Sequence, residues 1–298
     1  MGHRFTYVVS PEEERENLTV EWFLRRHGYS RHIITGLKRT EDGIFRNGVR
    51  ARAWTSQAVH AGDVIETHLV ETEPSDGILP RPVPFSVVYE DDDILVVDKP
   101  ADTPIHPSIG NYENTLANGI AWYFEQKGEP FVYRCINRLD RDTTGLIVLA
   151  KHALSAAVLS QAMRSREIHR TYQAFALGET AASGTIDAPI ARLDGSLIQR
   201  TVDFASGERS VTHYRTLAHC SVFSHLELNL ETGRTHQIRV HMAYIGHPLL
   251  GDTLYNKTPG TFPRQALHSA SLSFVHPITG EPLNFHAPLP EDMQNLLT

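Results

Sequence analysis

The sequence is poor in cysteine, and this scarcity narrows the class of protein. Among its 298 residues only Cys135 and Cys220 carry a thiol. Two thiols cannot build a framework of disulfide bridges, and free cysteines are typical of a reducing compartment. The polar N-terminus also lacks the hydrophobic stretch of a secretory signal. These absences predict a cytoplasmic protein.

Long hydrophobic runs and nucleotide-binding loops are missing as well. No apolar segment approaches the roughly 20 residues that a helix needs to cross a bilayer, so we expect no membrane partner. The sequence has neither a glycine-rich dinucleotide loop nor a phosphate-binding P-loop. Its 17 histidines do not indicate a metal site. His236 and His241 are five residues apart on a predicted helix, whereas ligands on one helix face are three or four apart.

Positive charge is scarce overall but unevenly distributed. The formal charge is −7 and the pI is about 6.2, which by themselves argue against a polyanionic partner. Residues 22–52, however, contain eight basic and only two acidic side chains. Residues 134–170 contain seven basic and three acidic ones. The two segments supply the clustered cations that binding of a nucleic acid requires.

The second basic segment contains the most informative feature of the chain. Asp140 lies between Arg138 and Arg141 and precedes Gly145 and the apolar run 146–150, which has the length and branching of an inner strand. Gly145 permits a backbone conformation that a side chain would resist. Two neighbouring arginines should keep the carboxylate ionised, as a nucleophile or a base requires. A surface ion-pair cluster on a tight turn would show the same residues, so local chemistry leaves both interpretations open.

The segment Arg138-Leu139-Asp140 and its apolar continuation resemble the signature of the RluA-type pseudouridine synthases. Asp140 matches the catalytic aspartate of that family. Further segments match in the family's order along most of the chain after about residue 85. They are Asp98-Lys99-Pro100, His106-Pro107, Arg170-Thr171-Tyr172, the run 232–242 (Thr-Gly-Arg-Thr-His-Gln-Ile-Arg-Val-His-Met) and the run 246–252 (Gly-His-Pro-Leu-Leu-Gly-Asp).

The chain departs from the family pattern in the loop 101–105 (Ala-Asp-Thr-Pro-Ile), where the family usually has a glycine and hydrophobic residues, and at three single positions. Asn137 stands where histidine is commonest, Thr144 where serine is usual, and Arg170 where lysine is usual. The first two residues keep hydrogen-bonding side chains, and the third keeps a cation. None of the changes removes the proposed carboxylate.

The resemblance implies an isomerase that detaches uracil from its ribose, turns the base and rejoins it through ring carbon 5. No atom is gained or lost, so the reaction needs no cofactor, which agrees with the missing nucleotide loops. Asp140 would act on the sugar or abstract a proton from it. Arg239 would pair with Asp140, and Tyr172 would stack on the target base.

The implied substrate is structured RNA, either ribosomal or transfer RNA. A base inside folded RNA must leave the stack before a carboxylate can reach it, and Arg138 is our candidate for bracing the gap. An ion pair of Arg138 with Asp140 or Asp142 is the structural alternative. The matched segments supply further candidate RNA-binding residues: Asn137, Thr143, Thr144, His106, Arg170 and Arg234.

The N-terminal basic segment has an architecture of its own. Leu18, Trp22 and Phe23 lie at helical spacing, a second helix is predicted near residues 30–38, and Asn47-Gly48 is a strong hairpin signal. With the segment 61–65, these features resemble the RNA-binding module called the alpha-L motif. A generic helical cap with a solvated basic face is the alternative. The candidate RNA-binding residues of this module are Arg25, Arg31 and Arg46.

The pattern of elements predicts an α+β fold in two domains. Residues 73–77 and the prolines at 80, 82 and 84 indicate an extended linker, which divides the chain into a small α/β RNA-binding module at 1–75 and a catalytic domain at 76–298. Residues 94–97 and 226–231 read as strands and 153–164 as an amphipathic helix, which favours a largely antiparallel mixed sheet flanked by helices. Thr235 is expected to cap a helix that Gly246 ends.

Two other functions remain open at this point. A catalytically silent RNA-binding or ribosome-assembly protein could share the fold, although it would not need Asp140, Tyr172 and Arg239 together. A hydrolase of glycosidic bonds would want a second carboxylate, for which Asp142 on the same turn is available. We expect the protein to be monomeric.

Overall fold

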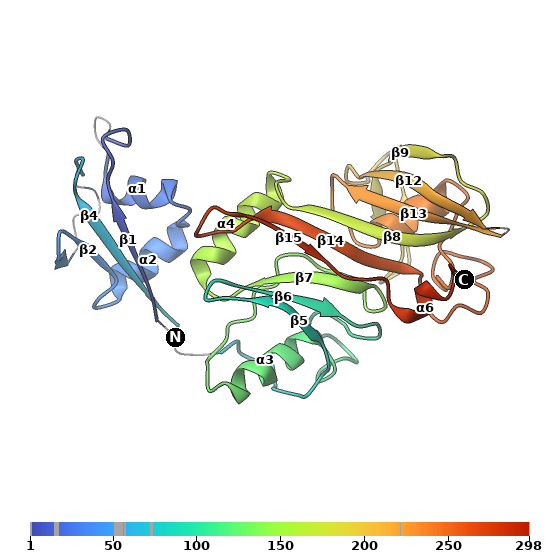
Figure 1. The fold of residues 1–298 in the computed structure, drawn as a ribbon, viewed down its shortest axis with the longest axis horizontal. Helices are drawn as coiled ribbons and strands as arrows, with labels where there is room; N and C mark the ends of the chain where they lie inside the picture. The colour runs from blue at the N-terminus through green and yellow to red at the C-terminus, as the bar shows by residue number, and fades with distance from the viewer. Residues whose placement is uncertain are drawn as a thin grey trace.

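The described residues fold around two large β-sheets, as the computed structural model shows (Figure 1), and a two-stranded hairpin forms a third, small sheet. The structure describes residues 2–14, 18–50, 56, 58–71, 74–220 and 222–297. Arg52 of the first basic segment and Glu73 of the linker lie outside the described residues. Within them no helix is long and apolar enough to span a membrane.

The N-terminal module consists of an antiparallel sheet with two helices. Its elements are β1 (Gly2–Val8), α1 (Val20–Arg26), α2 (Arg31–Arg39), β2 (Ile44–Arg46), β3 (Val49–Arg50) and β4 (Val64–Val70), and the strand order is β1-β4-β2-β3. Both expected helices are present, and the side chains of Thr19 and Ser30 cap them. Asn47 and Gly48 have φ of 50° and 75°, as the predicted hairpin turn between β2 and β3 requires. Strand β1 was not predicted, because its residues alternate only between exposed and half-buried positions.

The module packs against one helix of the second domain. Leu154 of α4 (Ala153–Arg164) belongs to the same buried cluster as Phe23 and Leu24 of α1. Gly28 lies so close to this helix that a Cβ there would be 2.5 Å from Cγ2 of Val158. The two domains therefore share apolar contacts, and Figure 1 shows the module at the end of the molecule where α4 lies.

The second domain is built on a mixed sheet whose pairs are nearly all antiparallel. Its strands are β5 (Ser86–Glu90), β6 (Ile94–Lys99), β7 (Thr144–Ala150), β8 (His169–Leu177), β9 (Ser183–Asp187), β12 (Val211–Cys220), β13 (Phe223–Leu230), β14 (Leu267–Val275) and β15 (Pro282–His286). The order is β5-β6-β7-β14-β8-β13-β12-β9, with β15 beside β14. Among the described strands only β7 and β14 pair in parallel. The predicted fold class is confirmed.

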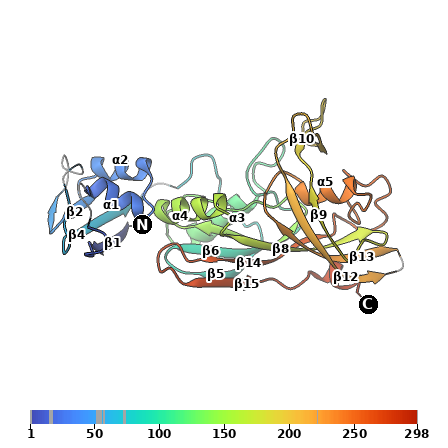
Figure 2. The same cartoon turned by 90° about the horizontal axis from the view of Figure 1, so that it is seen from above.

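Three further helices and a hairpin complete this domain. They are α3 (Leu116–Gln126), α5 (Gln237–Tyr244), α6 (Glu291–Gln294) and the hairpin of β10 (Ile190–Arg192) and β11 (Arg200–Val202). Seen from above, the hairpin stands away from the sheet on the side where α5 lies (Figure 2).

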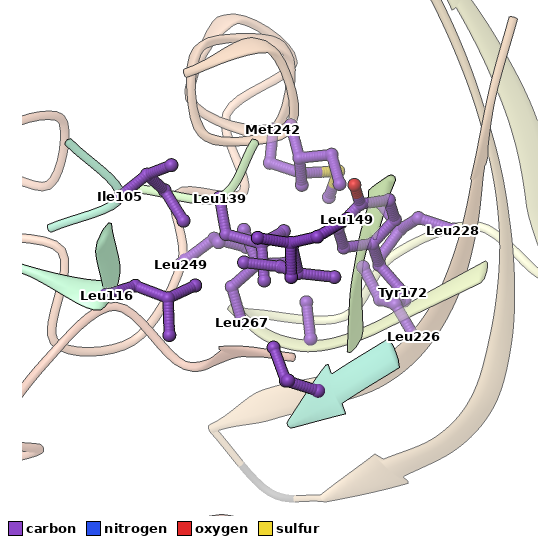
Figure 3. Close-up of a cluster of buried hydrophobic side chains, with 14 of the residues drawn as sticks. Ile105, Leu116, Leu139, Leu149, Tyr172, Leu226, Leu228, Met242, Leu249 and Leu267 are labelled. Carbon is purple, nitrogen blue, oxygen red and sulfur yellow. The ribbon is translucent and has the colours of Figure 1, made fainter. Parts of the chain in front are cut away.

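Strand β7 forms the centre of the catalytic domain, and every one of its residues is buried. Ile147 and Leu149 face a cluster that includes residues of α3 and α5, whereas Leu146 and Val148 face the opposite cluster with Leu159 of α4. Figure 3 shows part of the first cluster. The turn that precedes β7 is thus attached to a strand that is buried along its whole length.

The described residues 74–85, between the two domains, form neither a helix nor a strand, which agrees with the prolines. Strand β4 ends at Val70, and the backbone N–H of Ser75 already donates to the carbonyl of Phe131 in the second domain. The division at residues 75 and 76 stays a prediction that agrees with these contacts.

Helix α5 begins later than expected. Its N-cap is His236, with φ of 58°, and no side chain caps the helix. The prediction that Thr235 caps this helix is wrong, because the left-handed backbone at His236 turns the chain before the helix starts. The side chain of Gln237 instead accepts hydrogen bonds from the backbone of Arg234 and the hydroxyl of Thr232. Gly246, with φ of 87°, follows the helix as predicted.

Candidate active site

Asp140 lies on a tight turn immediately before β7. The backbone N–H of Thr143 donates to the carbonyl of Asp140 at 3.1 Å, which closes the turn. The carboxylate keeps 23% of its side-chain surface exposed and lines a cavity. A partly exposed anion on a fixed turn is suited to act on a bound molecule.

Two buried cations hold the backbone of this turn. Lys99, at the end of β6, donates from Nζ to the carbonyl of Arg141 at 2.8 Å and also to Pro100 and Thr103. Arg264 donates from Nη1 to the carbonyl of Asp142 at 3.1 Å. Burial lowers the pKa of Lys99 to about 7. Sequence reasoning placed Lys99 in a matched segment but gave it no role, because its burial is visible only in the fold.

Gly145 fixes the turn against β14. Its φ is 112°, and a Cβ at this position would lie 2.3 Å from the carbonyl oxygen of Ser269. The parallel pairing of Gly145 with Ser269 leaves no room for a side chain. The predicted conformational role of this glycine is confirmed, and the close approach to β14 adds a second reason for it.

Arg239 of α5 is the cation that pairs with Asp140. Its Nη1 donates to Oδ2 of Asp140 at 2.9 Å, across 99 positions of sequence. The flanking arginines do not pair with Asp140, contrary to expectation. Arg141 pairs with Asp102 at 3.0 Å and approaches Asp142, and Arg138 is exposed and makes no ion pair within the described residues. The turn directs both side chains away from the carboxylate that lies between them in the sequence.

Asp252 anchors the same guanidinium from the other side. Arg239 donates from Nε and Nη2 to the two oxygens of Asp252 at 2.7 and 2.9 Å, and Asp252 is fully buried. Burial alone would lower the pKa of Arg239, but the hydrogen bonds and charges of Asp252 and Asp140 outweigh it and raise that pKa above its ordinary value. The arginine is therefore a permanent charge with a fixed orientation.

His236 faces the second oxygen of Asp140. Its Nε2 lies 3.9 Å from Oδ1, and its Nδ1 is hydrogen-bonded to the hydroxyl of Tyr255 at 2.7 Å. Burial lowers the pKa of His236. Sequence reasoning missed Asp252, Tyr255 and His236 as site residues, although Asp252 and His236 lie in matched segments.

Tyr172 forms part of the cavity wall. It lies on β8 between Leu228 of β13 and Ser269 of β14, and it is almost completely buried. Figure 3 shows its ring near Leu228 and Met242. Burial raises the pKa of its phenol, which keeps the hydroxyl protonated. Tyr172 is nevertheless one of the residues that line the cavity.

These residues surround one cavity of about 750 Å³. Six arginines and two carboxylates line it, so the cavity is basic although the whole chain is acidic. Of the predicted site residues it brings together Asp140, Arg239, Tyr172, Arg138, Asn137, Thr143, His106, Arg170 and Arg234. Such a site can take a nucleotide with its phosphates and fix its base against an aromatic ring.

Comparison with known proteins identifies the family. A family model described as RNA pseudouridylate synthase matches residues 93–244, about half of the chain and the part that contains Asp140, Tyr172 and Arg239. The chain belongs to this family. It is an RNA pseudouridine synthase, an isomerase of uridine in RNA, and the predicted family and activity are confirmed.

Relatives match the synthase over most of their length. The uncharacterized RNA pseudouridine synthase YjbO of Bacillus subtilis (strain 168) is 39% identical over 281 residues, 94% of this chain and 98% of the relative. Ribosomal large subunit pseudouridine synthase D of Vibrio cholerae is 43% identical over 251 residues, 79% of this chain and 76% of the relative. The solved structure of human RNA pseudouridylate synthase domain containing 1 has a TM-score of 0.58 at 26% identity, and the match covers 73% of this chain and 86% of that one.

Three of the predicted RNA-binding residues of the synthase are buried, and their side chains are hydrogen-bonded within the protein. The amide of Asn137 donates to the carbonyl of Leu146 and accepts from the N–H of Val148. The hydroxyl of Thr143 accepts from the side chain of Gln265. The hydroxyl of Thr144 is hydrogen-bonded to Nδ1 of His268 and lies outside the cavity lining. These contacts fix the turn and β7, and they leave little of the three side chains for RNA.

The other predicted residues of the cavity are open to a ligand. His106 and Arg138 are exposed. Partial desolvation of the His106 ring, and after it the charge of Arg138, lower the pKa of His106. Arg234 is exposed and pairs with Glu208 at 2.5 Å. Arg170 is half-buried, and its Nε has no hydrogen-bond partner among the described residues.

The predicted residues of the N-terminal module lie away from this cavity. Arg25 and Arg31 are exposed and line a second cavity of about 1290 Å³ between the module and α4. Arg46 is half-buried, pairs with Asp63 at 2.6 Å and donates to the carbonyl of Ala58. Arg46 therefore closes the hairpin region, whereas neither Arg25 nor Arg31 makes an ion pair with another described residue.

One group of described side chains has the spacing of metal ligands: Asp91, Asp93 and His276. Nδ1 of His276 accepts from the backbone N–H groups of Ile278 and Thr279, so its Nε2 carries the proton and donates to Asp91 at 3.0 Å. With no lone pair directed at the carboxylates, the group fits a hydrogen-bond network better than a metal site.

Proposed function

We propose that this synthase converts uridines of ribosomal RNA to pseudouridine, with Asp140 as the carboxylate that acts on the ribose. The observation that carries the site assignment is the geometry of the carboxylate. Arg239 occupies Oδ2, and no described residue donates a hydrogen bond to Oδ1, which faces the basic cavity. One oxygen is thus fixed while the other is free to react.

The chemistry is an exchange of bonds within one nucleotide. The bond between ring nitrogen 1 and C1′ of the ribose breaks, the base turns, and a bond between ring carbon 5 and C1′ forms. The proton on carbon 5 leaves and ring nitrogen 1 gains one, so the atoms balance. Asp140 can begin the exchange by attack on C1′ or by removal of a proton from the sugar. The free oxygen serves either route.

Arg239 and Tyr172 support the reaction in different ways. Arg239 keeps Asp140 oriented in a site that is partly shielded from water, where an unpaired charge would be costly. Tyr172 presents an aromatic edge from the rigid sheet, against which the uracil can rest while it turns. Arg138, exposed at the mouth of the cavity, is placed to brace the RNA from which the base has been extruded.

The RNA path extends from the cavity toward the N-terminal module. Arg164, at the C-terminal end of α4, lines both the active-site cavity and the second cavity that contains Arg25 and Arg31. These arginines make no ion pair within the described residues, so their charges are available to phosphates. We propose that the RNA flanking the target uridine follows these three residues.

The ribosomal substrate and its setting are inferred from the relatives. Several proteins that are 41–43% identical to this chain are named ribosomal large subunit pseudouridine synthase D. On that basis we infer that the enzyme modifies ribosomal rather than transfer RNA in the cytoplasm, where ribosomes assemble. Its monomeric state stays a prediction from the sequence. No described contact favours a different function.

A map of pseudouridine in total cellular RNA tests the proposal. Cells with the wild-type chain, cells with Asp140→Ala and cells with the gene deleted should be compared, and Asp142→Asn provides a control on the same turn. We expect a ribosomal site to vanish in the deletion and with Asp140→Ala, and to persist with Asp142→Asn. A lost site in transfer RNA would refute the substrate. Identical maps would leave a catalytically silent RNA-binding protein as the better description.

A further inference from the structure

His236 lies beside the free oxygen of Asp140. The distance from Nε2 to Oδ1 is 3.9 Å, and both residues line the active-site cavity. The side chains keep 15% and 23% of their surface exposed. The pair therefore presents two polar atoms side by side at the wall of a space that must admit a nucleotide.

The backbone at His236 is held in an uncommon conformation. Its φ of 58° and ψ of 19° lie in the left-handed region, which costs free energy for a residue with a Cβ. Such conformations persist where the surroundings enforce them, and they are enriched at functional sites. Here the conformation turns the imidazole back toward Asp140 before α5 begins.

A chain of hydrogen bonds fixes the imidazole and its proton. The backbone N–H of Arg200, in β11, donates to the hydroxyl oxygen of Tyr255 at 2.9 Å. The proton of that hydroxyl is then free to donate to Nδ1 of His236, 2.7 Å away. With Nδ1 as acceptor, a neutral imidazole carries its proton on Nε2, which faces the carboxylate. Burial lowers the pKa of His236 and so favours this neutral form.

The distance between the two atoms fits one intervening oxygen. At 3.9 Å, Nε2 and Oδ1 are too far apart for a direct hydrogen bond. An oxygen about 2.8 Å from each can accept from Nε2 and donate to Oδ1. A hydroxyl group is both donor and acceptor, and the 2′-hydroxyl is the group that distinguishes RNA from DNA.

We propose that His236 is a catalytic residue that binds the 2′-hydroxyl of the target ribose, with that hydroxyl bridging Nε2 of His236 and Oδ1 of Asp140. The inference rests on the proposed role of Asp140. It places C2′ one bond and C1′ two bonds from the shared oxygen, so both atoms that the carboxylate could attack or deprotonate lie beside it. It also makes the enzyme selective for a ribonucleotide at the reacting position.

Two substitutions test the roles of the two imidazole nitrogens separately. The amide of an asparagine reaches about as far as Nδ1, and asparagine tolerates the left-handed conformation. His236→Asn thus keeps the contact with Tyr255 and removes the group that faces Asp140. The longer amide of His236→Gln reaches about as far as Nε2 and can donate to the hydroxyl. Thermal unfolding of both variants checks that each is folded.

The probes are synthetic RNA hairpins centred on the uridine that the cellular map identifies. Binding is measured to hairpins with pseudouridine or 2′-deoxypseudouridine at that position, because the product is not consumed. We expect the wild-type enzyme to bind the ribose form more than about tenfold more tightly, because the hydroxyl makes one hydrogen bond to the neutral imidazole and one to the charged carboxylate. His236→Asn should lose about three- to tenfold of this preference, the worth of the bond to Nε2, and should keep the part that comes from Asp140. His236→Gln should restore most of the lost part.

A wild-type enzyme without this preference, or a His236→Asn variant that retains it in full, would overturn the proposal. Conversion of the uridine hairpin is measured in parallel, and its kcat/KM should fall for His236→Asn. If the wild-type enzyme forms no pseudouridine in that hairpin, the proposed function itself fails, and the role of His236 fails with it. If the wild-type enzyme converts the uridine but does not prefer the ribose form, only the proposed role of His236 fails.

Discussion

Replacing either of the two carboxylates that bind Arg239 should lower both stability and activity, but in opposite order of size. Asp252 should matter more for stability, and Asp140 more for activity. In Asp252→Asn the amide keeps an oxygen for the backbone N–H groups of Leu254 and Tyr255, which Asp252 Oδ1 holds in the wild type. Its NH₂ group then faces Nε of Arg239, so two donors oppose each other and a buried charge loses its bidentate partner. In Asp140→Asn the guanidinium keeps both bonds to Asp252.

The structure sets the size of the two effects. Asp252 is fully buried and its bonds to Arg239 measure 2.7 and 2.9 Å, so breaking this pair should lower the free energy of unfolding by about 3–5 kcal/mol. Asp140 contributes one bond and is 23% exposed, so its loss should cost about 1 kcal/mol or less. Activity should show the reverse order, with complete loss for Asp140→Asn and partial loss for Asp252→Asn.

Urea unfolding followed by circular dichroism measures the stabilities, and pseudouridine formation in the identified RNA measures the activities. Because the m-value reports the surface exposed on unfolding, it should be the same for both variants. The reasoning would be refuted if Asp140→Asn destabilised the protein as much as Asp252→Asn, since the buried pair would then not be the anchor of Arg239.

Two further predictions concern the frame of the site. Gly145→Ala should lower the free energy of unfolding by about 2–5 kcal/mol, because it adds a clash with Ser269 to the strain of a positive φ. Gly280→Ala, at a positive φ in open space, is the control and should cost clearly less. Burial lowers the pKa of His241 and of His268, so the unfolded chain binds more protons as pH falls below about 6.5. The free energy of unfolding should therefore be highest above that pH and decrease as the pH falls below it. In His241→Gln this decrease should be smaller than in the wild type, and an equal decrease would contradict the assignment to His241.

Features that depend on neighbouring residues were predictable from the sequence. The helices 153–164 and near 30–38, the hairpin at Asn47-Gly48 and the buried strand after Gly145 all follow from periodicity and turn chemistry, which act over a few residues. The same local logic failed at Thr235, where a suitable cap residue is overruled by the left-handed backbone of His236. It also missed β1, whose alternation is weak because one face is exposed and the other only half-buried.

The sequence by itself determined the family, the carboxylate and the order of the main elements, because a motif is a set of residues close together along the chain. Only the tertiary structure decided which charges meet. It separated Asp140 from its two sequence neighbours and joined it to Arg239, and it buried Lys99 and Asp252 as supports. Electrostatic and hydrogen-bonding partners depend on distance in space, and a turn of four residues can direct adjacent side chains apart while a sheet brings distant ones together.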